Sequence, residues 1–215
     1  MHSSYPATWV VYEPLTGASS PTGPPNAGRN FGEAATLLTG ERCGNDCGKV
    51  LVVGGGYDSA GGGGLAPGYS TELYNPQTNL WELSEGSPIL GGQNVTLADG
   101  RVLMIGITEA SVSAPDRAAI YDPAARGVAA GEPKWRTVAT PPLRQLTRGT
   151  MMVLNGPSCG ANCGNVLIIS GAHCDPCFAG DSTRWFAYDT AYLYDPKADA
   201  WSPTSSCACP LPWGG

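Results

Sequence analysis

The sequence predicts an all-β protein in which a unit of four short strands is repeated along the chain. Short apolar runs, many of them β-branched, alternate with turns supplied by 30 glycines and 19 prolines. Apolar residues do not recur with the 3.6-residue period of a helix, so almost no helix is expected. Three stretches of the chain repeat the same four runs. Four strands to a repeat is typical of a β-propeller blade.

The three predicted blades cover residues 31–90, 91–147 and 148–206. Strands of the first are expected at residues 34–38, 49–56, 70–76 and around Trp81. Those of the second are expected at residues 94–97, 101–106, 118–123 and around Trp135. Those of the third are expected at residues 150–154, 165–171, 190–196 and around Trp201.

The third and fourth strands of each blade are joined by a recurring turn. Trp81 follows Tyr74 at the same distance at which Trp201 follows Tyr194, and an Asn-Pro or Asp-Pro pair stands directly after each tyrosine. The Asx side chain initiates such a turn and proline fixes φ. In the second blade the same pair, Tyr121 and Trp135, is separated by an insertion at residues 125–132.

These residues resemble the kelch repeat, whose pattern is a strand ending in Gly-Gly, then a tyrosine, then a tryptophan. Gly54 and Gly55 match the glycine pair in the first blade, whereas the second has Gly106–Ile107 and the third Ser170–Gly171. The resemblance covers roughly residues 31–201 and implies a kelch-type β-propeller. Glycines let strands pass closely near a crowded axis, and large aromatic side chains fill the wedge between neighbouring blades.

The two ends are predicted to belong to further blades. Residues 1–30 contain WVVYEPLT, which is expected to end a preceding blade, and residues 207–215 are expected to start another. Propellers close with four to eight blades, and an unclosed array exposes sheet edges. We therefore expect either a longer protein or self-association, in which two copies would make a six-bladed ring.

The charge and the cysteine content restrict the cellular compartment and the binding partners that are expected for this protein. The net charge is −6, with 18 acidic and 12 basic residues, so a nucleic-acid partner is not expected. No apolar stretch reaches the roughly 20 residues of a membrane span. Eight cysteines in close pairs favour an oxidising compartment. We expect a secreted or cell-surface protein, although residues 1–5 do not resemble a signal peptide.

The cysteines are predicted to form disulfides. Cys43 with Cys47, and Cys159 with Cys163, each fall in the loop between the first two strands of a blade. A second group follows the second and fourth strands of the third blade, which run parallel and therefore end on one face. Two bridges are expected within this group, and a zinc site of four thiolates, with His173 able to replace one, is the alternative. Its members are Cys174, Cys177, Cys207 and Cys209.

Recognition is expected from the long loops between the second and third strands, which share one face of a propeller. Long loops on a rigid scaffold commonly carry binding residues. The third of these loops holds an arginine and aromatic residues of the types enriched at binding hot spots, although the aromatic residues could instead cover the blade. The candidate binding residues are Tyr57, Asp58, Tyr69, His173, Arg184, Trp185, Phe186 and Tyr188.

The sequence therefore predicts a binding scaffold for a protein or a carbohydrate, with no cofactor and no catalytic role. One alternative is a fragment of a copper radical oxidase resembling galactose oxidase, which would need two histidines, a tyrosine and a Tyr–Cys crosslink. The chain has only His2 and His173, so that site cannot be assembled from this chain alone. A purely structural, self-assembling module is the other alternative.

Overall fold

The computed structural model describes residues 9–26, 29, 33–55, 69–108, 116–142, 149–169, 172–174, 185–187 and 191–204. Three four-stranded antiparallel sheets follow one another along the chain, each built from strands in chain order. The all-β propeller prediction is confirmed. The helices among the described residues are short 3-10 helices: η1 (Glu41–Asp46), η2 (Val128–Ala130) and η4 (Gly160–Asn162).

Each sheet is one blade. Blade 1 consists of β3 (Ala34–Leu37), β4 (Val50–Val53), β5 (Thr71–Asn75) and β6 (Leu80–Leu83). Blade 2 consists of β7 (Gly91–Thr96), β8 (Val102–Ile107), β9 (Arg117–Tyr121) and β10 (Trp135–Thr137). Blade 3 consists of β11 (Thr150–Val153), β12 (Val166–Ile169), β15 (Ala191–Asp195) and β16 (Ala200–Pro203). No helix among the described residues is long and apolar enough to span a membrane.

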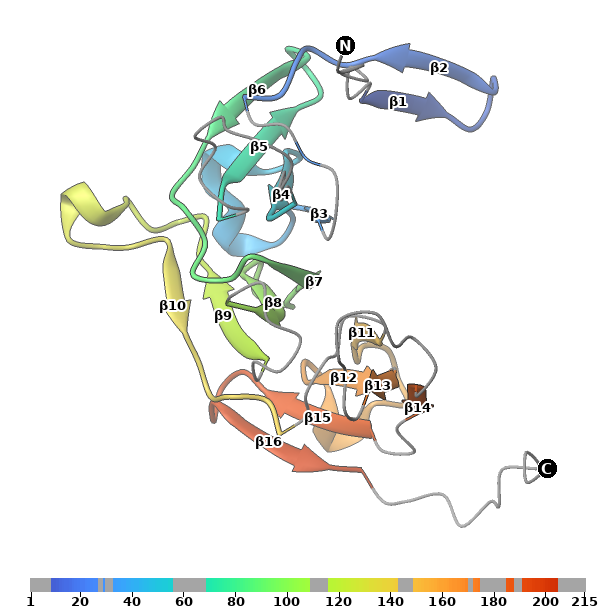
Figure 1. Cartoon of the computed structure of the whole chain (residues 1–215), viewed down its shortest axis with the longest axis vertical. Helices are drawn as coiled ribbons and strands as arrows, with labels where there is room; N and C mark the ends of the chain where they lie inside the picture. The colour runs from blue at the N-terminus through green and yellow to red at the C-terminus, as the bar shows by residue number, and fades with distance from the viewer. Residues whose placement is uncertain are drawn as a thin grey trace.

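The blades are arranged as an open arc (Figure 1). The first strands of neighbouring blades contact each other, β3 against β7 and β7 against β11. Two shorter hairpins accompany the blades. β1 (Val10–Glu13) pairs with β2 (Ala18–Pro21), and β13 (Ala172–Cys174) pairs with β14 (Trp185–Ala187). The hairpin β13–β14 lies in a segment that the sequence predicted to be a loop.

Neighbouring blades pack face to face through alternating residues. One core cluster joins Leu51, Val53 and Leu73 of blade 1 to Val102 and Tyr121 of blade 2. A second cluster joins the other face of blade 2 to blade 3. Its central members are Leu103, Ile105, Ile120, Val166, Ile168 and Tyr194. Since successive strand residues point to opposite sides of a sheet, each blade serves both of its neighbours.

Glycine is required where the strand backbones approach most closely. A Cβ atom at Gly106 would lie 1.8 Å from the carbonyl oxygen of Gly91, and one at Gly54 would lie 2.3 Å from that of Leu90. Side chains at these positions would force the strands apart. The close approach expected from the glycine-ended strands is therefore present at the end of β4 and at the end of β8.

The turn between the third and fourth strands is a repeated module. Residues Gly17, Asn79 and Asp199 occupy its corresponding position with φ of 71°, 58° and 51°, a region that favours Gly, Asn and Asp. Asn79 Oδ1 accepts hydrogen bonds from the Tyr74 hydroxyl at 3.0 Å and from the Gly23 N–H at 3.2 Å. Asp199 Oδ1 does the same with Tyr194 at 2.8 Å and with the Ala139 N–H at 2.9 Å. The turn thereby holds the segment that enters its own blade.

The hairpin β1–β2 has the pairing register of this module. Tyr12 faces Ser19 as Tyr74 faces Trp81 in blade 1 and Tyr194 faces Trp201 in blade 3. Its register matches that of the third and fourth strands of blades 1 and 3, and the expectation that it ends a preceding blade stays a prediction. The predicted blade start at residues 207–215 lies outside the described residues.

The far face of blade 3 is more exposed than the same face of blade 1. Met152 is 49% exposed and Ile169 is 46% exposed, whereas Val53, which matches Ile169 in blade 1, is fully buried against blade 2. The array is thus open at this end. The expectation of self-association or of further blades stays a prediction.

A buried ion pair holds the chain that leads into blade 1. Arg29 Nη2 lies 2.8 Å from Glu72 Oε1, and both side chains are fully buried. The same guanidinium donates to the carbonyl oxygens of Gly54 and Ser70. These three residues lie at the end of β4 and at the start of β5, so Arg29 holds the two ends of the loop between them.

Candidate functional site

The seam between blades 1 and 2 is filled by the disulfide loop of blade 1. The Arg42 N–H donates to the Asp99 carbonyl oxygen at 3.1 Å, and the Arg42 guanidinium pairs with the Asp122 carboxylate at 2.5 Å. That hydrogen bond and the charge of Asp122 raise the pKa of Arg42 above its ordinary value. Cys43 is only 2% exposed and belongs to the core cluster. The loop therefore packs into the seam between the two blades on this face.

The corresponding seam between blades 2 and 3 contains a pocket. Blade 2 has no disulfide loop, because β7 and β8 are joined by a short turn closed by a hydrogen bond from the Gly100 N–H to the Leu97 carbonyl oxygen. The space that a longer loop would fill is a cavity of about 370 Å³. Pockets of 300–1,000 Å³ are typical of sites for small ligands.

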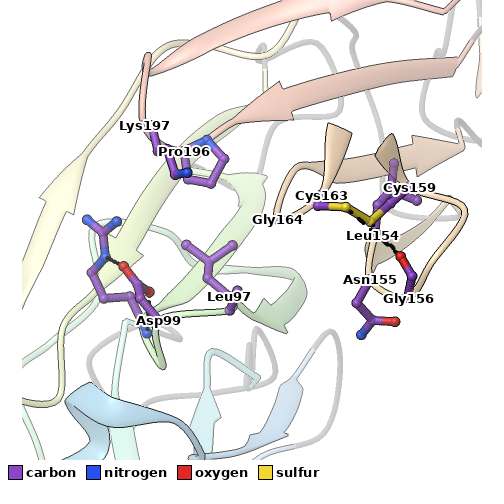
Figure 2. A pocket seen from close by; sticks show the side chains of 12 residues that line it. Leu97, Asp99, Leu154, Asn155, Gly156, Cys159, Cys163, Gly164, Pro196 and Lys197 are labelled. Atoms are coloured by element: carbon purple, nitrogen blue, oxygen red, sulfur yellow. Dashed lines mark hydrogen bonds and ion pairs between the residues drawn. A yellow bond between two sulfur atoms is a disulfide. The ribbon is translucent and has the colours of Figure 1, made fainter. Parts of the chain in front are cut away.

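Three turns on one face supply the walls of this pocket, as Figure 2 shows. They are the β7–β8 turn of blade 2, the disulfide loop of blade 3 and the β15–β16 turn of blade 3. The strands of a blade alternate in direction, so the loop between its first two strands shares a face with the turn between its last two. The lining residues with large apolar or charged side chains include Leu97, Asp99, Arg101, Leu154, Pro196 and Lys197.

The polar part of the pocket carries more positive than negative charge. Arg101 Nε lies 2.7 Å from Asp99 Oδ2, so these two charges largely neutralise each other. Lys197 is exposed and forms no ion pair among the described residues. Leu97 is 4% exposed and gives the pocket an apolar floor. The arrangement can accept a ligand with both an apolar part and a polar or anionic group.

The two local disulfides occupy different environments. Cys43 is bonded to Cys47, and Cys159 to Cys163. The first bond packs against blade 2, whereas Cys159 and Cys163 form one wall of the pocket. The same CGxxC hairpin thus fills a seam in one blade and borders an open cavity in the other.

The predicted recognition loops lie largely outside the described residues. Tyr57, Asp58, Arg184 and Tyr188 are among the residues that the structure does not describe. Tyr69 is described, and its hydroxyl donates to the Thr108 carbonyl oxygen. This bond joins the β4–β5 loop of blade 1 to the β8–β9 loop of blade 2. Tyr69 therefore has a structural role in linking the two loops.

Three of the predicted binding residues come together on the extra hairpin. His173 of β13 pairs with Phe186 of β14, and Cys174 pairs with Trp185, in backbone register. Cys177, Cys207 and Cys209, the other members of the predicted disulfide or zinc group, lie outside the described residues. Within the described part of the chain, His, Cys, Asp and Glu residues do not gather in groups of three or more that could hold a metal ion.

Sequence reasoning missed the pocket because it is formed by a difference between loops. CGNDC at residues 43–47 and CGANC at residues 159–163 mark long loops in blades 1 and 3, while the second repeat has only LADGR at residues 97–101. A missing insertion in one repeat is the signal that could have located the cavity. Which residues would face it depends on the packing of two blades.

Comparison with known proteins identifies no family for this chain. No protein-family model matches it, and no curated protein is similar to it in sequence. Among solved structures, it is similar to a fungal alcohol oxidase of the AA5 family, determined in complex with copper. The identity is 16% and the TM-score 0.47, over 96% of this chain and 50% of the oxidase. The chain thus spans about half the length of that oxidase.

Proposed function

We propose that this protein is an extracellular binding scaffold of the kelch-repeat type, and that it takes its ligand in the pocket between blades 2 and 3. The observation that carries the proposal is the open seam between blades 2 and 3. The corresponding seam between blades 1 and 2 is packed by the Arg42–Asp122 pair and Cys43. The pocket walls come from turns on a rigid sheet framework, an arrangement that commonly carries recognition.

The extracellular assignment rests on the two disulfides, since such bonds persist in oxidising compartments. The kelch-repeat assignment rests on the repeated Tyr–Trp pairs. Their ring centroids are 5.1 Å apart in blades 1 and 2 and 4.8 Å apart in blade 3. The glycine close approaches at Gly54 and Gly106 are its second support.

A binding role is favoured over oxidase chemistry by the residues at hand. A copper radical site of the galactose oxidase type would need two histidine ligands, and the sequence has His2 and His173 alone. His2 lies outside the described residues, and His173 lies on the extra hairpin rather than at the pocket. We derive no step through copper from these residues.

Filling the pocket tests the proposal. Ala98 is exposed and lines the cavity, so Ala98→Trp should occupy it without disturbing the core. Ala129, which is also exposed, lies in the insertion of blade 2, and Ala129→Trp is the matched control. Glycan and peptide panels screened against the immobilised protein should give ligands that Ala98→Trp no longer binds and Ala129→Trp still binds. Equal binding by both variants would contradict the pocket as the site.

A further inference from the structure

We propose that the pocket between blades 2 and 3 selects ligands that carry a carboxylate group next to a short apolar segment. This inference rests on the proposed binding role and names the chemical class of the ligand. An acidic amino-acid side chain and a uronic acid share this chemistry. Three features of the pocket support the inference: the charge, the hydrogen-bond donors that have no partner among the described residues, and the apolar floor.

The charge at the pocket is opposite to that of the chain. Arg101 and Lys197 against Asp99 leave one positive charge among the lining residues, whereas the whole chain carries −6. An acidic ligand is therefore repelled by most of the surface and attracted here. Attraction between exposed charges is screened by salt, so the affinity should fall as ionic strength rises.

The donors at the pocket suit a carboxylate. Asp99 engages Arg101 through Nε at 2.7 Å, and the terminal nitrogens of this guanidinium have no partner among the described residues. Lys197 supplies an ammonium group from the β15–β16 turn. Its own backbone N–H is already used by Asp195 Oδ1 at 2.8 Å, which fixes the turn that presents the side chain. A carboxylate accepts strong hydrogen bonds from both kinds of cation.

The floor of the pocket is apolar and suits the apolar segment of the ligand. Leu97, Leu154 and Pro196 line the cavity beside the Cys159–Cys163 disulfide, as Figure 2 shows. Among the described residues, no aromatic side chain lines the cavity. Selectivity is therefore expected to come from the charged groups rather than from ring stacking.

Matched pairs of probes test the inference. The first pair is methyl glucuronoside and methyl glucoside, and the second is N-acetylglutamate amide and N-acetylglutamine amide. Each is titrated into the ¹⁵N-labelled protein, and shifts of the amide resonances of residues 97–101, 154–156 and 196–197 are followed. The acid of at least one pair should shift these resonances at a concentration about tenfold lower than its neutral counterpart, and the responding pair identifies the source.

Charge variants separate this inference from the binding role. Lys197→Gln should weaken binding of the acid about tenfold, as expected for loss of a charged hydrogen bond. Arg126→Gln removes an equally positive side chain that is 70% exposed and remote from the pocket, and should leave the affinity unchanged. Equal binding of acid and neutral probes in the pocket would overturn the carboxylate preference while supporting the binding role. Shifts confined to residues away from the pocket would overturn both.

Discussion

Replacing Asn79 tests whether the turn module holds the entry segment of blade 1. Asn79 has φ of 58°, and its Oδ1 accepts hydrogen bonds from Tyr74 and from the Gly23 N–H. Glycine at this position keeps the backbone conformation, and with it the hydrogen bond from the Gly23 N–H to the carbonyl oxygen of residue 79, and loses both side-chain hydrogen bonds. Alanine loses the hydrogen bonds and must also adopt a left-handed conformation. The two variants therefore separate the side-chain contribution from the backbone contribution.

The expected losses follow from these two roles. Two partly exposed hydrogen bonds contribute about 1.5 kcal/mol to the free energy of unfolding, so Asn79→Gly should cost about that amount. The left-handed conformation adds about 1 kcal/mol for a residue with a Cβ, so Asn79→Ala should cost about 2.5 kcal/mol. Gly17 shows that glycine fits this turn, since it holds the corresponding position with φ of 71°.

Urea unfolding followed by tryptophan fluorescence measures both losses. Gln77→Ala is the control, because Gln77 is exposed in the same turn and the turn uses only its backbone N–H, bonded to Asn75. That variant should lie within about 0.5 kcal/mol of the parent protein. If Asn79→Gly were as stable as the control, the two side-chain hydrogen bonds of Asn79 would contribute nothing to holding the entry segment.

Three further predictions follow from burial, close approach and charge. Trp135 is only 8% exposed, so Trp135→Ala should cost about 3–5 kcal/mol; the partly exposed Trp81 should cost clearly less, and equal losses in urea unfolding would contradict this. Gly106→Ala would place a Cβ 1.8 Å from the Gly91 oxygen and should cost about 3 kcal/mol; an unchanged melting temperature would refute the close approach. Burial tends to raise the pKa of Asp199, but hydrogen bonds from Ala139 and Tyr194 and the charge of Arg136 lower it below the ordinary value of 3.8. The stability contributed by its carboxylate is present above pH 3.8 and is lost as the pH falls through the lower folded pKa, so Asp199→Asn should flatten that part of an acid-unfolding curve, and coincident curves would refute the assignment.

The strands could be predicted from the sequence because their signals are local. Most of the twelve blade strands contain a short apolar run bounded by turn residues, and Gly54 directly after β4 and Gly106 near the end of β8 mark the predicted close approach. The Asx turns are also local: Asn75, Asp122 and Asp195 accept a hydrogen bond from the N–H two residues further on. A pattern within a few residues is enough to specify such features.

Burial of the tryptophans could not be predicted from the repeat pattern. Trp81, Trp135 and Trp201 hold equivalent positions, and the sequence suggested similar burial for Trp81 and Trp201 in the core. Of the three, only Trp135 is buried. Its Nε1 donates to the Glu85 carbonyl oxygen at 3.0 Å, and the Glu85 carboxylate in turn accepts hydrogen bonds from the backbone N–H groups of Lys134 and of Val128 in the insertion of blade 2. The extent of burial depends on neighbouring segments that differ between blades.

The contacts between the turns and the segments that enter the blades also lie beyond what a local pattern specifies. Asn79 and Asp199 could be seen as turn residues, but their bonds to Gly23 and Ala139 join residues 56 and 60 positions apart. The pocket likewise depends on how two blades meet. The sequence therefore predicts the repeated unit well, and the candidate site only through the unequal length of its loops.

The buried Arg29 allows the β4–β5 loop to vary in length and sequence. Its side chain bonds the carbonyl oxygens of Gly54 and Ser70, which are themselves joined by a hydrogen bond from the Gly54 N–H to the Ser70 carbonyl oxygen at 3.1 Å. The base of the β4–β5 loop is thus closed independently of the residues between. Because lengthening an anchored loop costs little free energy, new peptide sequences could be inserted there by evolution or by protein engineering while blade 1 stays folded.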